Sequence, residues 1–438
     1  FIYNSNIFVK DLMDMQFKDM SKEELCSLKN DLQKQYDEFK SRGLSLDMSR
    51  GKPSPEQLDL STGLCDCVDY ETYSKNGGID CRNYGCIDGL PEVRQMFADI
   101  LGVSADSVIL GGNSSLNVMF DCISQGYTHG FGDTPWCKQG KIKFLCPSPG
   151  YDRHFCVTEY FGFELITVKM TENGPDMDAV EELVKDPAVK GIWCVPKYSN
   201  PTGITYSDET VRRFAALRPA AKDFRIFWDN AYAVHDLYED KKDTLLNLAD
   251  ECKKAGNEDI YFMFASTSKI AYPGSGVSAV ACSEGNKKIL LSRLKYQTIG
   301  PDKMNQLGHL CFFKNTQGIL DHMKLHASKL RPRFETVLSR LKNDLGEDGI
   351  ITWTEPVGGY FVSVDLTYGC AKEVVELCEQ AGVKLTGAGA TFPYGKDPEN
   401  KNIRLSPSFP PVEELDLAMQ LFTLCCKLAS AEKLIQSK

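Results

Sequence analysis

The chain has 438 residues, and its 50 Lys and Arg against 60 Asp and Glu give a formal net charge of −10. Charged residues make up 25% and hydrophobic residues 42%, which is typical of a folded globular protein with a sizeable core. An acidic chain without a Lys/Arg block has no general electrostatic surface for nucleic acid or for an anionic membrane, so neither is an expected partner. The length predicts roughly two to three domains.

No apolar run is long enough to cross a membrane, and Phe1–Lys10 lacks the basic and apolar regions of a signal peptide, so we expect neither. The 17 cysteines are an odd number scattered along the chain, which predicts reduced thiols and a cytoplasmic location. His322 and His326 stand four residues apart, but Met323 occupies the position where a zinc-protease motif has Glu. We therefore expect two ordinary histidines and no metal.

The first predicted helix is Lys22–Arg42, where Ser21 and Glu24 form the pattern of a capping box. Leu44–Asn76 is irregular, and from about Pro91 short β-rich runs alternate with helical stretches. The runs are Ser107–Leu110, Lys143–Cys146, Glu164–Lys169, Gly191–Val195, Arg225–Trp228, Tyr261–Ala265 and Gly276–Cys282. Apolar strands separated by helices predict an α/β fold with a doubly wound, mostly parallel, seven-stranded sheet.

The C-terminal part follows a different pattern. Leu307–Leu345 is predicted to be helical throughout, and Gly349–Lys438 mixes short strands with helices, which predicts a smaller α+β domain. The expected strands there are Tyr360–Asp365 and Asn402–Leu405, and the expected helices are Ala371–Ala381 and Val412–Ser437. We expect residues 1–75 to contribute a helix and a segment to the small domain, 76–315 to form the large α/β domain, and 316–438 to form the small one.

Four short motifs each follow a predicted strand. They are Gly111–Ser115, Asn200–Gly203, Asp229–Tyr232 and Ser266–Lys269. Taken singly, each has a plain structural explanation: a capped strand-to-helix turn, a Pro/Gly turn, a helix cap and a loop lysine. Successive strand ends of one sheet converge at one edge, however, and that edge is where open α/β sheets bind ligands.

The residue types at these strand ends suggest complementary chemistry. A Gly-rich turn that opens a helix offers free N–H groups to an anion. A carboxylate such as Asp229 at a buried strand end needs a cationic partner, and a cationic ring nitrogen would serve. A partly desolvated amine such as Lys269 loses its proton more easily and becomes nucleophilic.

In this order the motifs resemble the fold type I pyridoxal-phosphate enzymes, specifically the class I/II aminotransferases, from about Gly51 to Arg404. The resemblance implies a pyridoxal 5′-phosphate cofactor, an amino acid and a 2-oxo acid as substrates, and a homodimer with shared active sites. It implies that Lys269 forms the Schiff base with the cofactor and shuttles the proton. It also implies that Asp229 pairs with the pyridinium nitrogen and keeps the ring an electron sink.

The other matches are carried over from the same resemblance. Tyr232 and Asn200 match the pair that hydrogen-bonds the ring 3′-oxygen, and Arg404 matches the arginine that grips the substrate α-carboxylate. The remaining expected positions are Gly112, Asn113 and Ser114 in the phosphate turn, Ser266 and Ser268 beside it in the cofactor site, Tyr151 stacking on the ring, Tyr84 reaching the phosphate of the neighbouring subunit, and Gly51 near the substrate.

One departure concerns the phosphate. Many members carry an Arg about eight residues beyond the lysine by family resemblance, whereas here no Arg or Lys follows Lys269 until Lys287. The phosphate would then rely on hydroxyls, backbone N–H groups and a helix end, or on a cation from elsewhere. Leu46–Ser61 and Pro273–Val277 look like the MocR-like aminotransferase subgroup, whose members are assigned as aspartate aminotransferases.

The expected reaction is a ping-pong transfer of the amino group from L-aspartate to 2-oxoglutarate. Arg50 and Lys52 flank Gly51 and are candidates to bind the distal carboxylate, although either could be a solvated loop charge. The same motifs would serve an aminotransferase or lyase for another amino acid, such as an aromatic, branched or sulfur-containing one, or an inactive scaffold. A MocR-like transcriptional regulator is disfavoured, because only about fifty residues precede Arg50, too few for a DNA-binding head and linker.

Overall fold

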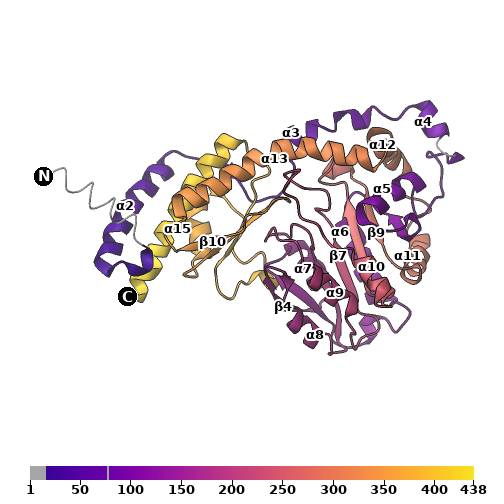
Figure 1. Ribbon diagram of the computed structural model, residues 1–438, viewed down its shortest axis with the longest axis horizontal. Coiled ribbons are helices and arrows are strands. Elements are labelled where there is room, and N and C mark those ends of the chain that lie inside the picture. The colour runs from indigo at the N-terminus through magenta and orange to yellow at the C-terminus, as the bar shows by residue number, and fades with distance from the viewer. Residues whose placement is uncertain (1–15, 76–77) are drawn as a thin grey trace.

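The computed structural model describes residues 16–75 and 78–438 (Figure 1). The predicted absence of a signal peptide concerns Phe1–Lys10, which lies outside the described residues, as does the start of the predicted segment 1–75. The helices are α2 (Lys22–Ser41), α3 (Pro55–Asp59), α4 (Tyr70–Lys75), α5 (Pro91–Leu101), α6 (Ser115–Thr128), α7 (Asp152–Tyr160), α8 (Met177–Leu183), α9 (Asp208–Ala216), α10 (Leu248–Lys254), α11 (Glu284–Gln297), α12 (Lys303–Phe313), α13 (Thr316–Leu345), α14 (Ala371–Gln380) and α15 (Val412–Ser437).

The large sheet has the strand order β2-β9-β8-β7-β6-β3-β4-β5. Its strands are β2 (Val108–Leu110), β3 (Lys143–Ser148), β4 (Glu164–Thr171), β5 (Gly174–Pro175), β6 (Val189–Cys194), β7 (Arg225–Asp229), β8 (Tyr261–Ser266) and β9 (Ser278–Ala281). The pairs from β4 through β3, β6 and β7 to β8 are parallel, while β9 and β5 run antiparallel to their neighbours. The predicted mostly parallel α/β sheet is confirmed.

The strand count differs from the prediction, because the sheet has eight strands instead of seven. The additional strand is β5, which has two residues and pairs with the end of β4. A two-residue strand contains no periodic pattern, so the sequence gives no signal for it.

Both faces of the large sheet are buried. Along β7, Ile226 and Trp228 pack into one hydrophobic cluster and Phe227 into another, because successive side chains of a strand point to opposite faces. All residues of β7 are buried, and its apolar centre, Ile226–Trp228, lies between Arg225 at one end and the Asp229 carboxylate at the other. The charged residues of β7 therefore stand at the two ends of the strand.

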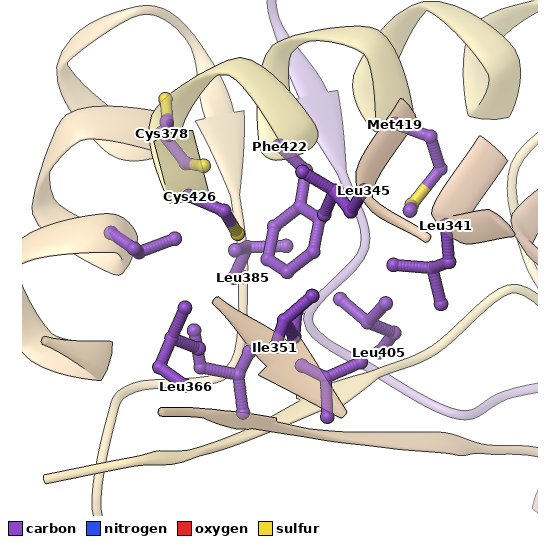
Figure 2. Close-up of a cluster of buried hydrophobic side chains, with 14 of the residues drawn as sticks. Leu341, Leu345, Ile351, Leu366, Cys378, Leu385, Leu405, Met419, Phe422 and Cys426 are labelled. Carbon is purple, nitrogen blue, oxygen red and sulfur yellow. The ribbon is translucent and has the colours of Figure 1, made fainter. Parts of the chain in front are cut away.

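The smaller region contains the antiparallel sheet β10 (Ile351–Trp353), β11 (Val362–Leu366) and β13 (Asn402–Leu405), and a two-stranded pair of β1 (Leu46–Asp47) with β12 (Val383–Lys384). Helices α13 and α15 cover the antiparallel sheet (Figure 1). The apolar side chains between them belong to one core, shown in Figure 2, which includes Leu341, Leu345, Ile351, Leu405, Met419 and Phe422.

The N-terminal helix α2 lies beside the C-terminal helix α15, although they are at opposite ends of the sequence (Figure 1). Its predicted capping box is present, because Ser21 Oγ accepts from the Glu24 backbone N–H and Glu24 Oε2 accepts from the Ser21 backbone N–H at 2.7 Å. The strand pair of β1 with β12 joins the same N-terminal segment to the C-terminal region. The proposed boundaries at 75 and 315 remain predictions.

The prediction of continuous helix over Leu307–Leu345 is wrong. Helix α12 ends at Phe313 and α13 begins at Thr316. Lys314 between them has φ +66°, a left-handed conformation that no α-helix continues through, and the Asn315 side chain caps α13 by accepting from the Gly318 backbone N–H. Apolar residues on both sides of the break hide it from a periodicity argument. Within residues 16–75 and 78–438, no helix is both long and apolar enough to span a membrane.

Candidate active site

Lys269 and Asp229 stand at the ends of neighbouring parallel strands. Asp229 is the last residue of β7, and Lys269 lies three residues beyond the end of β8. Tyr232 follows Asp229 in the loop, and its buried ring lies under the lysine, with Nζ 4.9 Å from the ring centroid. Burial lowers the pKa of Lys269, and so does the charge of Arg404, whereas Asp229 acts in the opposite direction. The amine is therefore poised to lose its proton.

The Asp229 carboxylate is 2% exposed and has a specific partner on one side only. Its Oδ2 lies 3.0 Å from His154 Nε2. Its Oδ1 is buried and has no hydrogen-bond partner among the residues that the structure describes. An unpaired carboxylate oxygen in a buried position is costly, so this atom is suited to accept a hydrogen bond from a bound ligand.

His154 was not among the predicted site residues. It is buried in α7, its ring stacks on Trp193 with centroids 4.5 Å apart, and Tyr151 lies edge-on to it at 4.8 Å. The spacing of Tyr151 and His154 places both on one side of the first helical turn, which is the only sequence signal that links them. Burial raises the pKa of Tyr151 to about 12, so its phenol stays protonated.

The predicted phosphate turn opens helix α6. Ser114 is the N-cap, and its Oγ accepts from the Leu116 backbone N–H at 3.2 Å. The Gly112 carbonyl accepts from both the backbone N–H and the hydroxyl of Ser278, at 2.8 Å each, which ties the turn to β9. A Cβ at Gly112 would meet no atom within 4 Å, so the turn borders open space. A helix N-terminus facing open space can receive an anion.

Two predicted hydroxyls lie against this turn. Ser268 Oγ donates to the Asn113 carbonyl at 2.7 Å, and Ser266 Oγ donates to Ser268 Oγ at 3.2 Å. A Cβ on Gly276 would lie 2.5 Å from the Asn113 carbonyl oxygen, so only glycine allows the loop after Lys269 to approach so closely. Lys287, the first cation after Lys269, points elsewhere, and its Nζ donates to the Asp106 carbonyl at 2.7 Å.

Arg404 lies in β13 of the small sheet and is 7% exposed. Its Nη1 lies 3.1 Å from both Asn200 Oδ1 and Asp152 Oδ1. Its Nη2 contacts Thr386 Oγ1 at 3.4 Å, and its Nε is buried with no partner among the described residues. The guanidinium therefore contacts Asn200, which was predicted to be a site residue. It also contacts Asp152, which was not predicted.

Phe361 supports Arg404 from below, with the guanidinium carbon 4.8 Å from the ring centroid. Gly51 packs directly on this ring, because an added Cβ would lie 2.3 Å from Phe361 Cζ. The predicted Gly51 is therefore near the site, and its lack of a side chain makes room for an aromatic ring that the sequence did not single out.

The remaining predicted residues lie on the surface of the single chain. Tyr84 is 77% exposed. Arg50 and Lys52 are also exposed, and Lys52 Nζ lies 3.9 Å from the centroid of the Phe409 ring. The other catalytic and substrate-binding candidates thus lie together in one site, whereas Tyr84, Arg50 and Lys52 lie on the protein surface.

The arrangement fits the predicted cofactor. A buried carboxylate oxygen has no donor among the described residues, an amine whose pKa is lowered by burial stands at the next strand end, and a helix N-terminus with hydroxyls faces open space. These are the groups that a pyridine nitrogen, an aldehyde and a phosphate require. Fold and site define a pyridoxal-phosphate-dependent enzyme of fold type I.

The comparisons with known proteins identify the family. A family model described as aspartate amino-transferase matches residues 20–438. An aspartate aminotransferase of Corynebacterium glutamicum is 47% identical over 423 residues, which cover 96% of this chain and 98% of that protein. The chain belongs to the aspartate aminotransferase family and is an aminotransferase.

Solved structures agree with this assignment. The crystal structure of an aspartate transaminase from Corynebacterium glutamicum superimposes with a TM-score of 0.93 at 47% identity, covering 96% of this chain and 99% of that one. LysN, an α-aminoadipate aminotransferase of Thermus thermophilus complexed with N-(5′-phosphopyridoxyl)-L-leucine, gives a TM-score of 0.70 at 20% identity over 89% of this chain and 93% of that one. At that identity the second likeness concerns the fold alone. The expected membership of the MocR-like subgroup stays a prediction.

Proposed function

We propose that this enzyme transfers the amino group of L-aspartate to 2-oxoglutarate in a ping-pong cycle. The observation that carries the proposal is the convergence of Lys269, the unpaired Oδ1 of Asp229 and the buried Arg404 in one site. The 47% identity to an aspartate aminotransferase supports L-aspartate as the donor.

Bound pyridoxal phosphate would supply an electron sink and carry the amino group between the two half-reactions. Asp229 Oδ1 would accept a hydrogen bond from the ring nitrogen and keep it charged. Tyr232 and Asn200 would hydrogen-bond the ring 3′-oxygen, and Tyr151 would stack on the ring. These roles agree with the burial of Tyr232 and Asn200 beside Lys269 and Arg404.

The cofactor phosphate would lie at the N-terminus of α6. Backbone N–H groups of the turn and the two nearby serine hydroxyls would bind it, without the arginine that many relatives use. The residues proposed for this are Gly112, Asn113, Ser114, Ser266 and Ser268.

Lys269 Nζ would take the α-proton of the substrate and return it to the cofactor carbon. Its lowered pKa supports this role, because a base must be unprotonated to accept a proton. Arg404 would form a bidentate ion pair with the substrate α-carboxylate, near Gly51. Arg50 and Lys52 remain the candidates for the distal carboxylate, since both are exposed and border Gly51.

We also propose that the enzyme is a cytoplasmic homodimer with shared active sites. Two large side chains near one another in the fold, Tyr84 and Ile299, are 77% and 68% exposed, and the Gly85 backbone N–H joins their loops by donating to the Ile299 carbonyl. Such exposed residues suit a subunit contact in which Tyr84 reaches the phosphate of the second copy. The 17 free thiols support a reducing compartment.

The test is a donor panel with the pyridoxal-phosphate-loaded enzyme. L-aspartate with 2-oxoglutarate should give oxaloacetate and glutamate in equal amounts, with a higher kcat/KM than aromatic, branched or sulfur-containing donors. Release of ammonia without glutamate would indicate a lyase, and a higher kcat/KM for another donor would overturn the choice of L-aspartate.

A further inference from the structure

The main-chain carbonyls of Lys269 and Ile270 are held by buried polar side chains that come from distant parts of the sequence. The Lys269 carbonyl faces His235 Nε2 at 3.3 Å and accepts from Tyr360 Oη at 3.5 Å. The Ile270 carbonyl lies 3.0 Å from His322 Nε2. Two consecutive carbonyls just after the side chain of Lys269 are therefore fixed from outside their own loop.

Gln57 in α3 connects these groups. The Ser54 backbone N–H donates to its Oε1 at 3.1 Å, so the amide nitrogen points the other way. Its Nε2 then donates to Tyr360 Oη at 3.2 Å and to His326 Nδ1 at 3.0 Å. The side chain is fully buried and all of its hydrogen-bonding groups are used.

The chain of contacts continues along α13. Because His326 Nδ1 accepts from Gln57, the ring proton of neutral His326 is on Nε2, and this N–H donates to the Ile270 carbonyl. His322 Nε2 lies 3.0 Å from the same carbonyl and 3.1 Å from His326 Nε2, so the two imidazole N–H groups converge on one carbonyl oxygen. Burial, together with neighbouring His322, lowers the pKa of His326 to about 3, and burial also lowers the pKa of His322. At neutral pH both rings are uncharged members of one buried network.

We infer that Gln57, Tyr360, His235, His322 and His326, here called the carbonyl clamp, are positioning residues that set where the Lys269 amine stands. The inference rests on the proposed role of Lys269. The clamp binds main-chain carbonyls, and within the described part of the chain no hydrogen bond joins it to the amine. It holds the backbone on which the long side chain of Lys269 is carried, and it ties that backbone to α3, to α13 and to the residues before β11.

The physical reason for such a clamp is the position of Lys269 in a loop. Beyond β8 no sheet hydrogen bonds hold its carbonyl, so the loop needs other partners to stay in one conformation. Proton transfer requires the amine within about 3 Å of the reacting carbon, and small displacements cost large factors in rate. The charged groups that face the amine are Asp229 and Arg404, so a shift also changes its electrostatic surroundings.

The central experiment uses the Gln57→Leu variant of the cofactor-loaded enzyme. Leucine fills similar space but donates to neither Tyr360 nor His326. We expect kcat to fall by about 10-fold with KM little changed, because the amine is misplaced while Arg404 is not. We also expect the pH midpoint of the cofactor's visible absorption to move upward, since a looser loop admits water and favours the protonated form of the Lys269 nitrogen that is joined to the cofactor.

Two controls separate positioning from stability. Gln125→Leu removes another buried glutamine, whose Nε2 donates to the Gly130 carbonyl at 3.0 Å far from Lys269, and it should leave the absorption midpoint unchanged. Ser54→Ala removes the hydroxyl that caps α3 but leaves the Gln57 amide bonds, so it should lower the melting temperature without moving the midpoint.

Tyr360→Phe provides a second route if Gln57→Leu does not fold, because it keeps the ring and removes only the hydroxyl between Gln57 and the Lys269 carbonyl. It should move kcat and the midpoint in the same directions by smaller amounts. The inference is overturned if the folded variants keep the wild-type kcat and midpoint. In that case, loss of the visible band in Lys269→Ala would show that the proposed role of Lys269 still stands, whereas a retained band would refute that role.

Discussion

Asp229 and His154 form a buried pair, with the carboxylate Oδ2 3.0 Å from the imidazole Nε2 and both side chains almost completely excluded from water. The pair leaves the second carboxylate oxygen of Asp229 free for a ligand. Trp193 stacks on the imidazole and fixes the plane of the ring. The imidazole in turn fixes the orientation of the Asp229 carboxylate. A carboxylate that must keep a ring nitrogen charged is better oriented by such a partner than by mobile water.

The pair predicts the effect of His154→Ala. Without the imidazole, the buried Asp229 Oδ2 loses its only hydrogen-bond partner among the described residues, so the carboxylate is less firmly oriented toward the ring nitrogen. We expect kcat to fall on the order of 10-fold, because a hydrogen bond to a charged group is lost, and the affinity for pyridoxal phosphate to fall as well. Steady-state kinetics and cofactor titration measure both. His129→Ala alters an exposed histidine and should behave as wild type; equal losses in the two variants would contradict the assigned role.

Lys269→Ala tests the central amine. The variant should fold, since the side chain is half-buried and its loop is held by main-chain contacts, but it should lose turnover and the visible absorption of the bound cofactor. Circular dichroism checks the fold, and absorption spectra check the cofactor. Lys287→Ala, which removes a lysine that contacts Asp88 and Asp106, should keep the visible band. Persistent turnover in Lys269→Ala would show that another group acts as the base.

Asp152 shares the Arg404 guanidinium with Asn200, so its charge competes with the incoming carboxylate of a substrate. Asp152→Asn should keep a hydrogen-bonding side chain and remove that competition. We expect KM for the amino acid to fall about three- to tenfold with kcat little changed. Asp178→Asn, at an exposed carboxylate that pairs with Arg213, is the matched control. A higher KM would mean that Asp152 orients the arginine more than it competes.

Gly51→Ala should disturb the support of Arg404. The new methyl group would overlap the Phe361 ring, and relieving the overlap must move either the ring or the loop. We expect a loss of about 1–3 kcal/mol in the free energy of unfolding and a raised KM. Gly308→Ala adds a methyl that meets its nearest atom at 3.7 Å in a helix, so it should not lower stability. An unchanged KM in Gly51→Ala would show that Gly51 has no role in substrate binding.

The buried His326 predicts a pH dependence of stability. Its pKa is lowered from 6.5 to about 3, so the unfolded chain takes up a proton near neutrality and the folded chain does not. Above pH 6.5 the group has no effect, and below it the free energy of unfolding should fall by up to about 1.4 kcal/mol per pH unit until the folded group titrates.

Urea unfolding across this acidic range measures the slope. His326→Gln should be less sensitive to acid than the wild type, even if it is less stable at neutral pH. His129→Gln should keep the wild-type slope, because the side chain is exposed. An equal slope in wild type and His326→Gln would show that His326 takes up its proton in the folded protein as readily as in the unfolded chain.

Many elements could be predicted from local patterns. The capping box at Ser21 and Glu24, the strand Asn402–Leu405 and the helix Val412–Ser437 match the structure because each is specified by neighbouring residues. The break at Lys314 was missed, because apolar periodicity persists on both sides of it and a single left-handed residue leaves no pattern. The edge strand Gly174–Pro175 was missed because two residues are too few to show an alternating pattern.

The sequence by itself determined the order of strand ends and the kinds of side chain placed there, since an amine, a carboxylate and a Gly-rich helix start are local features. Only the tertiary structure decided which partners these groups meet. His154 reaches Asp229, Phe361 reaches Gly51 and Gln57 reaches Tyr360 across 75, 310 and 303 positions of sequence, respectively. Contacts at such separations arise from the packing of one element on another, and packing direction is not encoded in the residues immediately around either partner.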